Sequence, residues 1–159
     1  RHMGTSLDRI DIALLTAMQR RPGASQRELA EAIGLSQNAC WRRIKRLEQA
    51  GVLRGTAPLL DRHALGLDLV VFTMIRTRHH SAEWLERFRA HVASVPEVVD
   101  FFRIAGEYDY MLKIVTANMA GFDSVYRRLI EDFDLETVTS FFAMEALAEN
   151  RPLPLGASG

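Results

Sequence analysis

The chain has 159 residues, 48% of them hydrophobic and 25% charged, and its formal net charge at pH 7 is zero. That size suits one ordinary domain or two small ones, and no run approaches the roughly 18 apolar residues that a membrane span needs. The single cysteine, Cys40, excludes a disulfide within the chain and a metal cluster of cysteines, and it agrees with a reducing cytoplasm.

The charge is unevenly spread along the chain. Residues 1–60 carry ten Lys and Arg against five Asp and Glu, a balance of +5, and residues 61–159 carry ten against fifteen, a balance of −5. Two modules of opposite charge are therefore expected, with the basic one meeting a polyanion. The opening RHMGTS resembles the remnant of an expression tag and is left out of the fold predictions.

The basic half begins with a predicted helix. Ile10, Leu14 and Met18 recur every fourth residue and mark one helix face. Asp8 is the expected N-cap, and the RPG sequence at 21–23 stops the helix.

A second helix is predicted in SQRELAEAIG, residues 25–34. Ser25 and Glu28 have the spacing of a capping box, in which each side chain satisfies a backbone N–H at the helix start. Gly34 supplies the left-handed residue that ends the helix. Its apolar face is expected to consist of Leu29, Ala32 and Ile33.

A third helix is predicted after Ser36, its expected N-cap. Two helices joined by a short turn that contains glycine are the signature of a helix-turn-helix. Cys40, Ile44 and Leu47 recur at i, i+4 and i+7 and should pack inward, with Cys40 as a small buried residue rather than a nucleophile. The residues left facing outward are Gln37, Asn38, Trp41, Arg42, Lys45 and, in part, Arg46 and Gln49.

The outward face of this third helix has the chemistry to bind double-stranded DNA. In a helix-turn-helix the second helix enters the major groove, where Gln and Asn can pair with adenine, and Arg with guanine. Lys and Arg further along the helix can hold phosphates. A merely solvated basic face is the alternative, and Trp41 could instead pack against the second module or a partner chain. The predicted DNA contacts are Ser36, Gln37, Asn38, Trp41, Arg42, Lys45 and Arg46.

Two short extended runs follow the third helix. VLRG and TAPLL meet at Gly55 and predict a small hairpin or an outgoing strand, the wing of a winged helix-turn-helix, which ends at Pro58. The DNA-binding domain is therefore predicted at residues 7–60 and a linker at 61–67.

The acidic half alternates strands and helices in the order β-α-β-β-α-β. This order predicts a ferredoxin-like domain at residues 68–149, and hence an α+β fold for the chain, followed by a Pro-rich tail at 150–159. Gly106-Glu107 is expected to form a tight type II′ turn between the second and third strands. The segments are a strand in 69–78, a helix in 81–96, two strands in 97–117, a helix in 119–133 and a strand in 136–147.

The strands carry more large apolar side chains than one helix-covered face can bury. A second apolar face of a sheet is normally covered by another subunit, so at least a homodimer is expected. The tail is expected to be ordered only against a neighbouring subunit. The apolar strand residues concerned are Val70, Phe72, Val99, Phe101, Phe141 and Phe142.

From Leu7 to about Glu149 the chain resembles the Lrp/AsnC (leucine-responsive, feast/famine) transcriptional regulators. The resemblance rests on LDRIDIALLTAM, RELAEAIGLS, RRIKRLEQAGVLRG and IAGEYDYMLKI together. It implies a dimer as building block, assembly to octamers, and a small effector such as an amino acid bound between dimers. One departure is Asp134-Leu135, which stands where the family usually has a Gly-Val turn.

The resemblance also implies an effector site. The Gly-x-Tyr/Phe-Asp hairpin of the family matches Gly106, Glu107, Tyr108 and Asp109, and the segment that completes the site matches Thr137, Thr139 and Ser140. An amino acid's ammonium group at Asp109 and its carboxylate at backbone N–H groups near Gly106 would suit such a turn. In the alternative, Asp109 only caps its hairpin or pairs with Lys113.

Three other functions compete with an effector-responsive regulator. An enzyme is not expected, because the histidines lack the spacing and carboxylate partners of a metal site, and neither a catalytic residue nor a cofactor is predicted. An architectural, nucleoid-type DNA-binding protein without an effector is the main alternative, against which the intact hairpin motif argues. An effector-binding module that has lost DNA binding is opposed by the polar and basic face of the third helix.

Overall fold

The computed structural model describes residues 6–156, so that most of the tag-like start and residues 157–159 of the tail lie outside the described part. The chain divides into two compact units. One unit, called the DNA-binding unit after the function predicted for its helices, runs up to Leu60 and resumes at Ala148. The other, the sheet unit, is Asp61–Leu147. None of the helices in the described part is long and apolar enough to cross a membrane.

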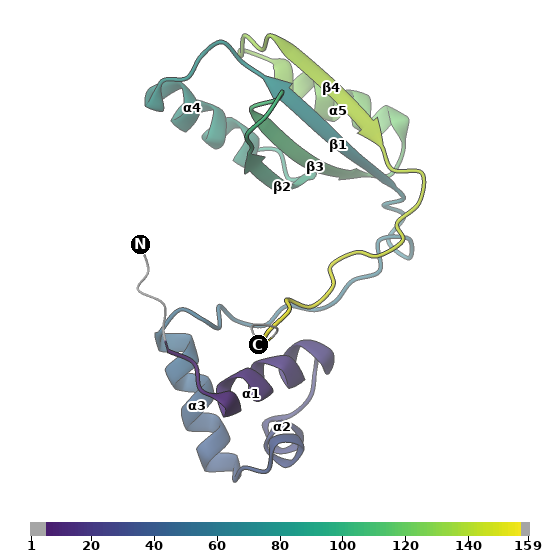
Figure 1. Ribbon diagram of the computed structural model, residues 1–159. Helices are drawn as coiled ribbons and strands as arrows, with labels where there is room; N and C mark the ends of the chain where they lie inside the picture. Colours follow the sequence, from purple (N-terminus) through teal and green to yellow (C-terminus); the bar gives the residue numbers. More distant parts are fainter. Residues whose placement is uncertain (1–5, 157–159) are drawn as a thin grey trace. The chain divides into compact units, whose positions relative to one another are not determined.

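The DNA-binding unit contains the three predicted helices, α1 (Arg9–Arg20), α2 (Gln26–Ile33) and α3 (Gln37–Gln49), as Figure 1 shows. Asp8 and Ser36 cap α1 and α3 as predicted. Ser25 caps α2 by accepting the Glu28 N–H at 3.1 Å, but the Glu28 side chain does not return a bond to the Ser25 N–H, so only half of the predicted capping box forms. Gly34 ends the helix with φ at 71°.

The three helices enclose one small core, which includes the predicted Cys40, Ile44 and Leu47. Burial raises the pKa of the Cys40 thiol, in keeping with an apolar packing role. Two predicted core positions are wrong. Ile10 of α1 and Ala32 of α2 are exposed, and Leu15 and Ala30 are buried on these helices instead.

The segment after α3 is extended, but it forms no strand within the described residues. The Val52 and Leu53 N–H groups both donate to the Leu47 carbonyl and end the helix. A hairpin needs a partner strand to complete its backbone hydrogen bonds. The predicted wing therefore exists here only as an extended arm.

The sheet unit has the predicted β-α-β-β-α-β order and strand arrangement β2-β3-β1-β4, with every neighbouring pair antiparallel. Both helices cover the same face of the sheet (Figure 1). The elements are β1 (Leu69–Arg76), α4 (Ala82–Ala93), β2 (Val98–Arg103), β3 (Tyr110–Thr116), α5 (Met119–Ile130) and β4 (Thr137–Phe142). This is the ferredoxin-like fold.

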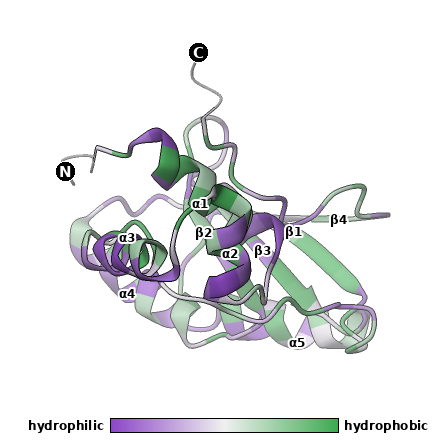
Figure 2. Cartoon of the chain, turned by 90° about the horizontal axis from the view of Figure 1, so that it is seen from below, coloured by the Kyte–Doolittle hydropathy of each residue, from purple (hydrophilic) through white to green (hydrophobic). Residues whose placement is uncertain are grey.

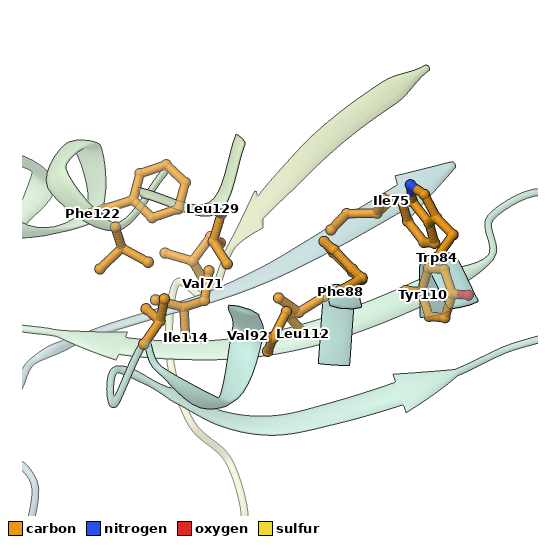
Figure 3. Packing of buried hydrophobic residues seen from close by; sticks show 12 residues of the cluster. Val71, Ile75, Trp84, Phe88, Val92, Tyr110, Leu112, Ile114, Phe122 and Leu129 are labelled. Atoms are coloured by element: carbon orange, nitrogen blue, oxygen red, sulfur yellow. The ribbon is translucent and has the colours of Figure 1, made fainter. Parts of the chain in front are cut away.

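The core of the sheet unit lies between the helices and this covered face. Figure 3 shows Trp84 and Tyr110 at one end of the core and Phe122 and Leu129 at the other. Phe88 is fully buried and stacks on Trp84, with 4.9 Å between ring centroids.

Hydrophobic colour runs along the strands in Figure 2, and hydrophilic colour along much of α2 and α3.

The opposite, open face of the sheet is also partly apolar, as predicted, but two residues are assigned differently. A bulge at Val98/Asp100 shifts the alternation of β2, so that Phe101 pairs with the inward-facing Leu112 and Phe102 lies on the open face. Phe142 contacts Phe122 of α5 and is therefore on the helix side. Phe102 and Phe141, which lie on the open face, are 53% and 56% exposed.

Two other predictions differ from the structure. The turn between β2 and β3 is not a two-residue type II′ turn, because the Ile104 N–H donates to the Asp109 carbonyl at 2.8 Å and encloses residues 105–108. The tail does not require a neighbour for its order, because residues 150–156 pack on the DNA-binding unit of their own chain.

Candidate functional site

The exposed face of α3 presents the predicted DNA contacts together. Gln37, Asn38 and Arg42 are exposed, and Trp41 is 47% exposed. The Lys45 ammonium lies 5.8 Å from the centre of the Trp41 ring, within range of a cation–π contact, and 3.3 Å from Glu48 Oε2 in an exposed ion pair. An unburied indole beside exposed cations is suited to a flat, anionic partner.

Ser36 has a structural role at the start of α3. Its Oγ accepts the Ala39 N–H at 3.2 Å, so that the hydroxyl is occupied by the helix cap. Its part in DNA binding would therefore be to position the first turn, where Gln37 and Asn38 begin the exposed face.

Two arginines of α3 are held by Asp8, the N-cap of α1, and by Asp11 within α1. Arg46 Nη2 lies 2.6 and 2.5 Å from the two carboxylate oxygens of Asp11, which is fully buried. Arg43 Nη1 bridges Asp8 and Asp11 at 2.8 and 3.0 Å. The Arg43 guanidinium lowers the pKa of the Asp8 carboxyl to about 2. The predicted DNA contact Arg46 is therefore partly neutralised within the protein.

Sequence analysis does not identify this network. The two acids have the i, i+3 spacing of a capping box, which the structure shows to be complete: each side chain accepts the other residue's N–H. The i, i+3 spacing could have predicted the capping box. The pairing of the two acids with arginines more than 30 positions later could not be predicted from spacing.

The predicted effector residues other than Ser140 lie at one end of the sheet, on the loop between β2 and β3 and at the start of β4. The Tyr108 hydroxyl donates to Thr139 Oγ1 at 3.4 Å, which joins the loop to β4. Thr137 precedes Thr139 on the same face of β4, two residues along the strand. Gly106 and Glu107 are exposed in the loop.

Arg76 belongs to the same cluster, although sequence analysis missed it. Its Nε donates to the Glu107 carbonyl at 2.8 Å, and its Nη2 lies 3.4 Å from Glu107 Oε1. The guanidinium also lies over the Tyr108 ring, 5.5 Å from its centre. The end of β1 thus adds a cation to a loop that the sequence shows only as Gly, acidic and aromatic residues.

Asp109 has a backbone partner. Its Oδ2 accepts the Thr77 N–H at 2.8 Å, and its own N–H donates to the Ile75 carbonyl at 2.8 Å. The half-buried carboxylate therefore ties the loop to the end of β1, a role that the sequence did not predict.

Ser140 lies on the opposite side of the sheet from Thr137 and Thr139. Its Oγ is 3.0 Å from Oγ1 of Thr73, a fully buried residue on the helix side. Successive residues of a strand point to opposite faces, so Ser140 and Thr139 cannot contact the same small molecule on one face.

Known families match both units. The model of the Lrp/AsnC ligand binding domain matches residues 70–153, and that of a winged helix-turn-helix DNA-binding domain matches residues 7–54. The chain belongs to the Lrp/AsnC family. It is therefore a DNA-binding transcriptional regulator with a ligand-binding domain.

Relatives and solved structures agree with this membership. The DNA-binding transcriptional activator DecR of Escherichia coli strain K12 is 45% identical over 150 residues, which cover 94% of this chain and 99% of the relative. The glutamate uptake regulatory protein of Zymomonas mobilis is 42% identical and is covered to 91%, over 94% of this chain. Both relatives are regulatory proteins.

Two solved structures cover nearly the whole chain. An AsnC family transcriptional regulator from Agrobacterium tumefaciens has a TM-score of 0.89 and 40% identity, over 93% of this chain and 97% of that one. A transcriptional regulator from Neisseria meningitidis, solved as a complex with L-Met, has a TM-score of 0.88 and 32% identity, over 95% and 98%.

Proposed function

We propose that this regulator reads a specific duplex sequence with the exposed face of α3 and responds to an amino acid through a change of assembly. The observation that carries the first part is the exposed set of Trp41, Arg42 and Lys45 on a helix whose remaining arginines are occupied by Asp8 and Asp11. Arg42 reads bases, and Lys45 holds a phosphate.

Arg42→Ala is expected to weaken binding to the specific site by about 1–3 kcal/mol, since a bidentate contact to guanine is lost. Lys45→Ala is expected to weaken all duplexes alike and to reduce the salt slope of the affinity by about one. Fluorescence anisotropy over a salt series measures both. Arg89→Ala is the control, because it removes an equal charge from an exposed pair in the sheet unit. If Arg42→Ala and Lys45→Ala behave like the control, this face of α3 does not bind DNA.

Binding of the parent chain to DNA without sequence preference would instead support the alternative function, that of an architectural, nucleoid-type protein. In that case all duplexes of equal length would bind equally, with a steep salt slope. Selection of a preferred site from a random-sequence duplex library separates the two functions.

The effector is proposed to lie at the cluster of Arg76, Glu107, Tyr108 and Thr139. The ligand-binding family model and the L-Met complex of the Neisseria meningitidis relative support an amino acid. Its ammonium group would meet Oδ1, the second carboxylate oxygen of Asp109, and its carboxylate the loop N–H groups near Gly106, with Arg76 adjacent. Ser140 would act only by holding β4 to β1 through Thr73.

Asp109→Asn separates the proposed ionic role of this residue from its structural one. The amide oxygen can still accept the Thr77 N–H, but the negative charge is gone. Loss of a charged hydrogen bond costs about 1.5–3 kcal/mol, so affinity for the best-binding amino acid should fall at least about tenfold. Calorimetry with the twenty amino acids identifies that ligand in the parent. Unchanged affinity in the variant would remove Asp109 from the site.

A homodimer formed through the open sheet face, and further assembly to an octamer, is proposed from the exposed Phe102 and Phe141. An effector held between dimers would favour one assembly and re-space the recognition helices on DNA. Phe141→Asp is expected to shift the parent's mass in light scattering from a dimer or larger toward the 18.0 kDa chain. Met119→Asp, on the exposed start of α5, is the matched control. A parent that is already monomeric at micromolar concentration contradicts this assembly.

A further inference from the structure

The C-terminal strap, residues 150–156, is fastened to the end of helix α1. The side-chain amide of Gln19 makes two hydrogen bonds to the backbone of Leu153 in the strap. Gln19 Oε1 accepts the Leu153 N–H at 2.7 Å, and Gln19 Nε2 donates to the Leu153 carbonyl at 3.2 Å. This arrangement copies the pairing of two strands, with a side-chain amide in place of one backbone. It fixes the strap at one point along its length.

The sequence of the strap favours docking through Leu153 alone. Pro152 and Pro154 flank Leu153, and proline restricts the chain to an extended conformation and lacks an N–H group. Docking therefore costs little chain entropy. The Leu153 N–H is the one donor between the two prolines, and Gln19 satisfies it.

Beyond Leu153 the strap packs against the core of the DNA-binding unit. Leu155 packs against the cluster that contains Leu14 and Leu47, and the backbone at Gly156 comes so close to α1 that a Cβ there would lie 3.2 Å from Ile12 Cγ2. The strap also lines a groove of about 860 Å³, together with Val52 and residues of α1. Removing the strap would expose this apolar surface.

The strap is the direct continuation of β4. The Ala143 N–H donates to the Val70 carbonyl at 2.9 Å, so sheet pairing extends one residue beyond the strand. Only residues 144–149 separate that bond from the strap. The strap and this extended end of β4 are therefore joined by a covalent segment of six residues.

Helix α1 joins the strap to the recognition helix. Gln19 lies in its last turn, and Asp11 in its first turn holds Arg43 and Arg46 of α3. A single helix thus contacts the strap at one end and the two arginines beside the DNA-binding face at the other.

We propose that the C-terminal strap is a latch that couples strand β4 to the DNA-binding unit, so that DNA bound at α3 and the state of β4 influence each other. Docked on Gln19, the strap holds α1, and hence the arginines of α3, in the arrangement described here. Much of the strap is exposed, with Leu153 71% exposed, so it can release without unfolding either unit. The proposal rests on the DNA binding of the family and not on the proposed effector site.

Coupling between two sites is reciprocal, so DNA can serve as the probe. Hydrogen exchange measured by mass spectrometry compares peptides from α1 and β4 with and without a mixed-sequence duplex of several helical turns at low salt. Gln19→Leu removes both hydrogen bonds to the strap and keeps a side chain of similar size. A chain that ends at Glu149 lacks the strap, and a chain that ends at Gly156 is its control.

Two results are expected. Exchange in α1 becomes several-fold faster in Gln19→Leu and in the chain that ends at Glu149, but not in the chain that ends at Gly156. The duplex alters exchange of β4 in the parent and in the control, and this effect is lost in both strap variants. The proposal is overturned if α1 exchange is the same with and without the strap, if the duplex never alters β4, or if its effect on β4 survives in Gln19→Leu.

Discussion

Replacing Phe88 by alanine is expected to lower the free energy of unfolding of the sheet unit by about 3–5 kcal/mol, because a fully buried phenyl ring leaves a cavity when it is removed. Phe88 stands at the centre of an aromatic cluster. Its ring centroid lies 4.9 Å from that of Trp84, 5.2 Å from Phe133 and 5.6 Å from Tyr110. Neighbouring rings are rigid and cannot close around the space that Phe88 leaves.

Urea unfolding followed by tryptophan fluorescence measures this loss. The chain has two tryptophans, so a Trp41→Phe background leaves Trp84 as the reporter of the sheet unit. Phe88→Leu is the matched comparison, since a leucine fills part of the space and should cost roughly 1–1.5 kcal/mol. Equal and small losses for both variants would mean that the cluster repacks freely, contrary to its close ring contacts.

Asp11→Ala is expected to destabilise the DNA-binding unit by about 2 kcal/mol. Breaking a fully buried ion pair costs roughly 3–5 kcal/mol, and the value is reduced here because the Arg43 and Arg46 side chains are 25% and 53% exposed and regain water. The freed guanidinium of Arg46 lies beside the DNA-binding face. Non-specific affinity for duplex DNA should therefore rise while stability falls.

Native-state hydrogen exchange of the α3 amides measures the stability change within this unit, and anisotropy with a mixed-sequence duplex measures the affinity. Glu31→Ala is the control, because its exposed pair with Arg27 should contribute less than about 0.5 kcal/mol. Stability equal to that of the control would show that Asp11 does not hold α1 to α3. Lower non-specific affinity would show that Arg46 already contacts DNA while bound to Asp11.

Local signals in the sequence determined the elements of both units. The caps at Ser25 and Ser36 and the left-handed Gly34 act within a few residues, so their positions could be predicted from spacing alone. The strand and helix order of the acidic half likewise follows from the hydrophobic period of each segment. The motifs in both halves then identified the family.

Small departures from regular alternation were decided only by the tertiary structure. The bulge in β2 exchanges the faces of Phe101 and Phe102, and a bulge depends on the partner strand rather than on the strand's own sequence. The separation of Thr139 from Ser140 by the sheet was predictable in principle from alternation, but the side to which each points depends on the pairing with β1.

Contacts between distant positions also required the folded chain. Arg76 meets Glu107 and Tyr108 because β1 and β3 are neighbours, and Arg46 reaches Asp11 because α1 crosses α3. The strap at Leu153 meets Gln19 from the far end of the chain. Periodicity shows which face of a segment is buried, whereas the partner of a side chain is set by how those faces pack together.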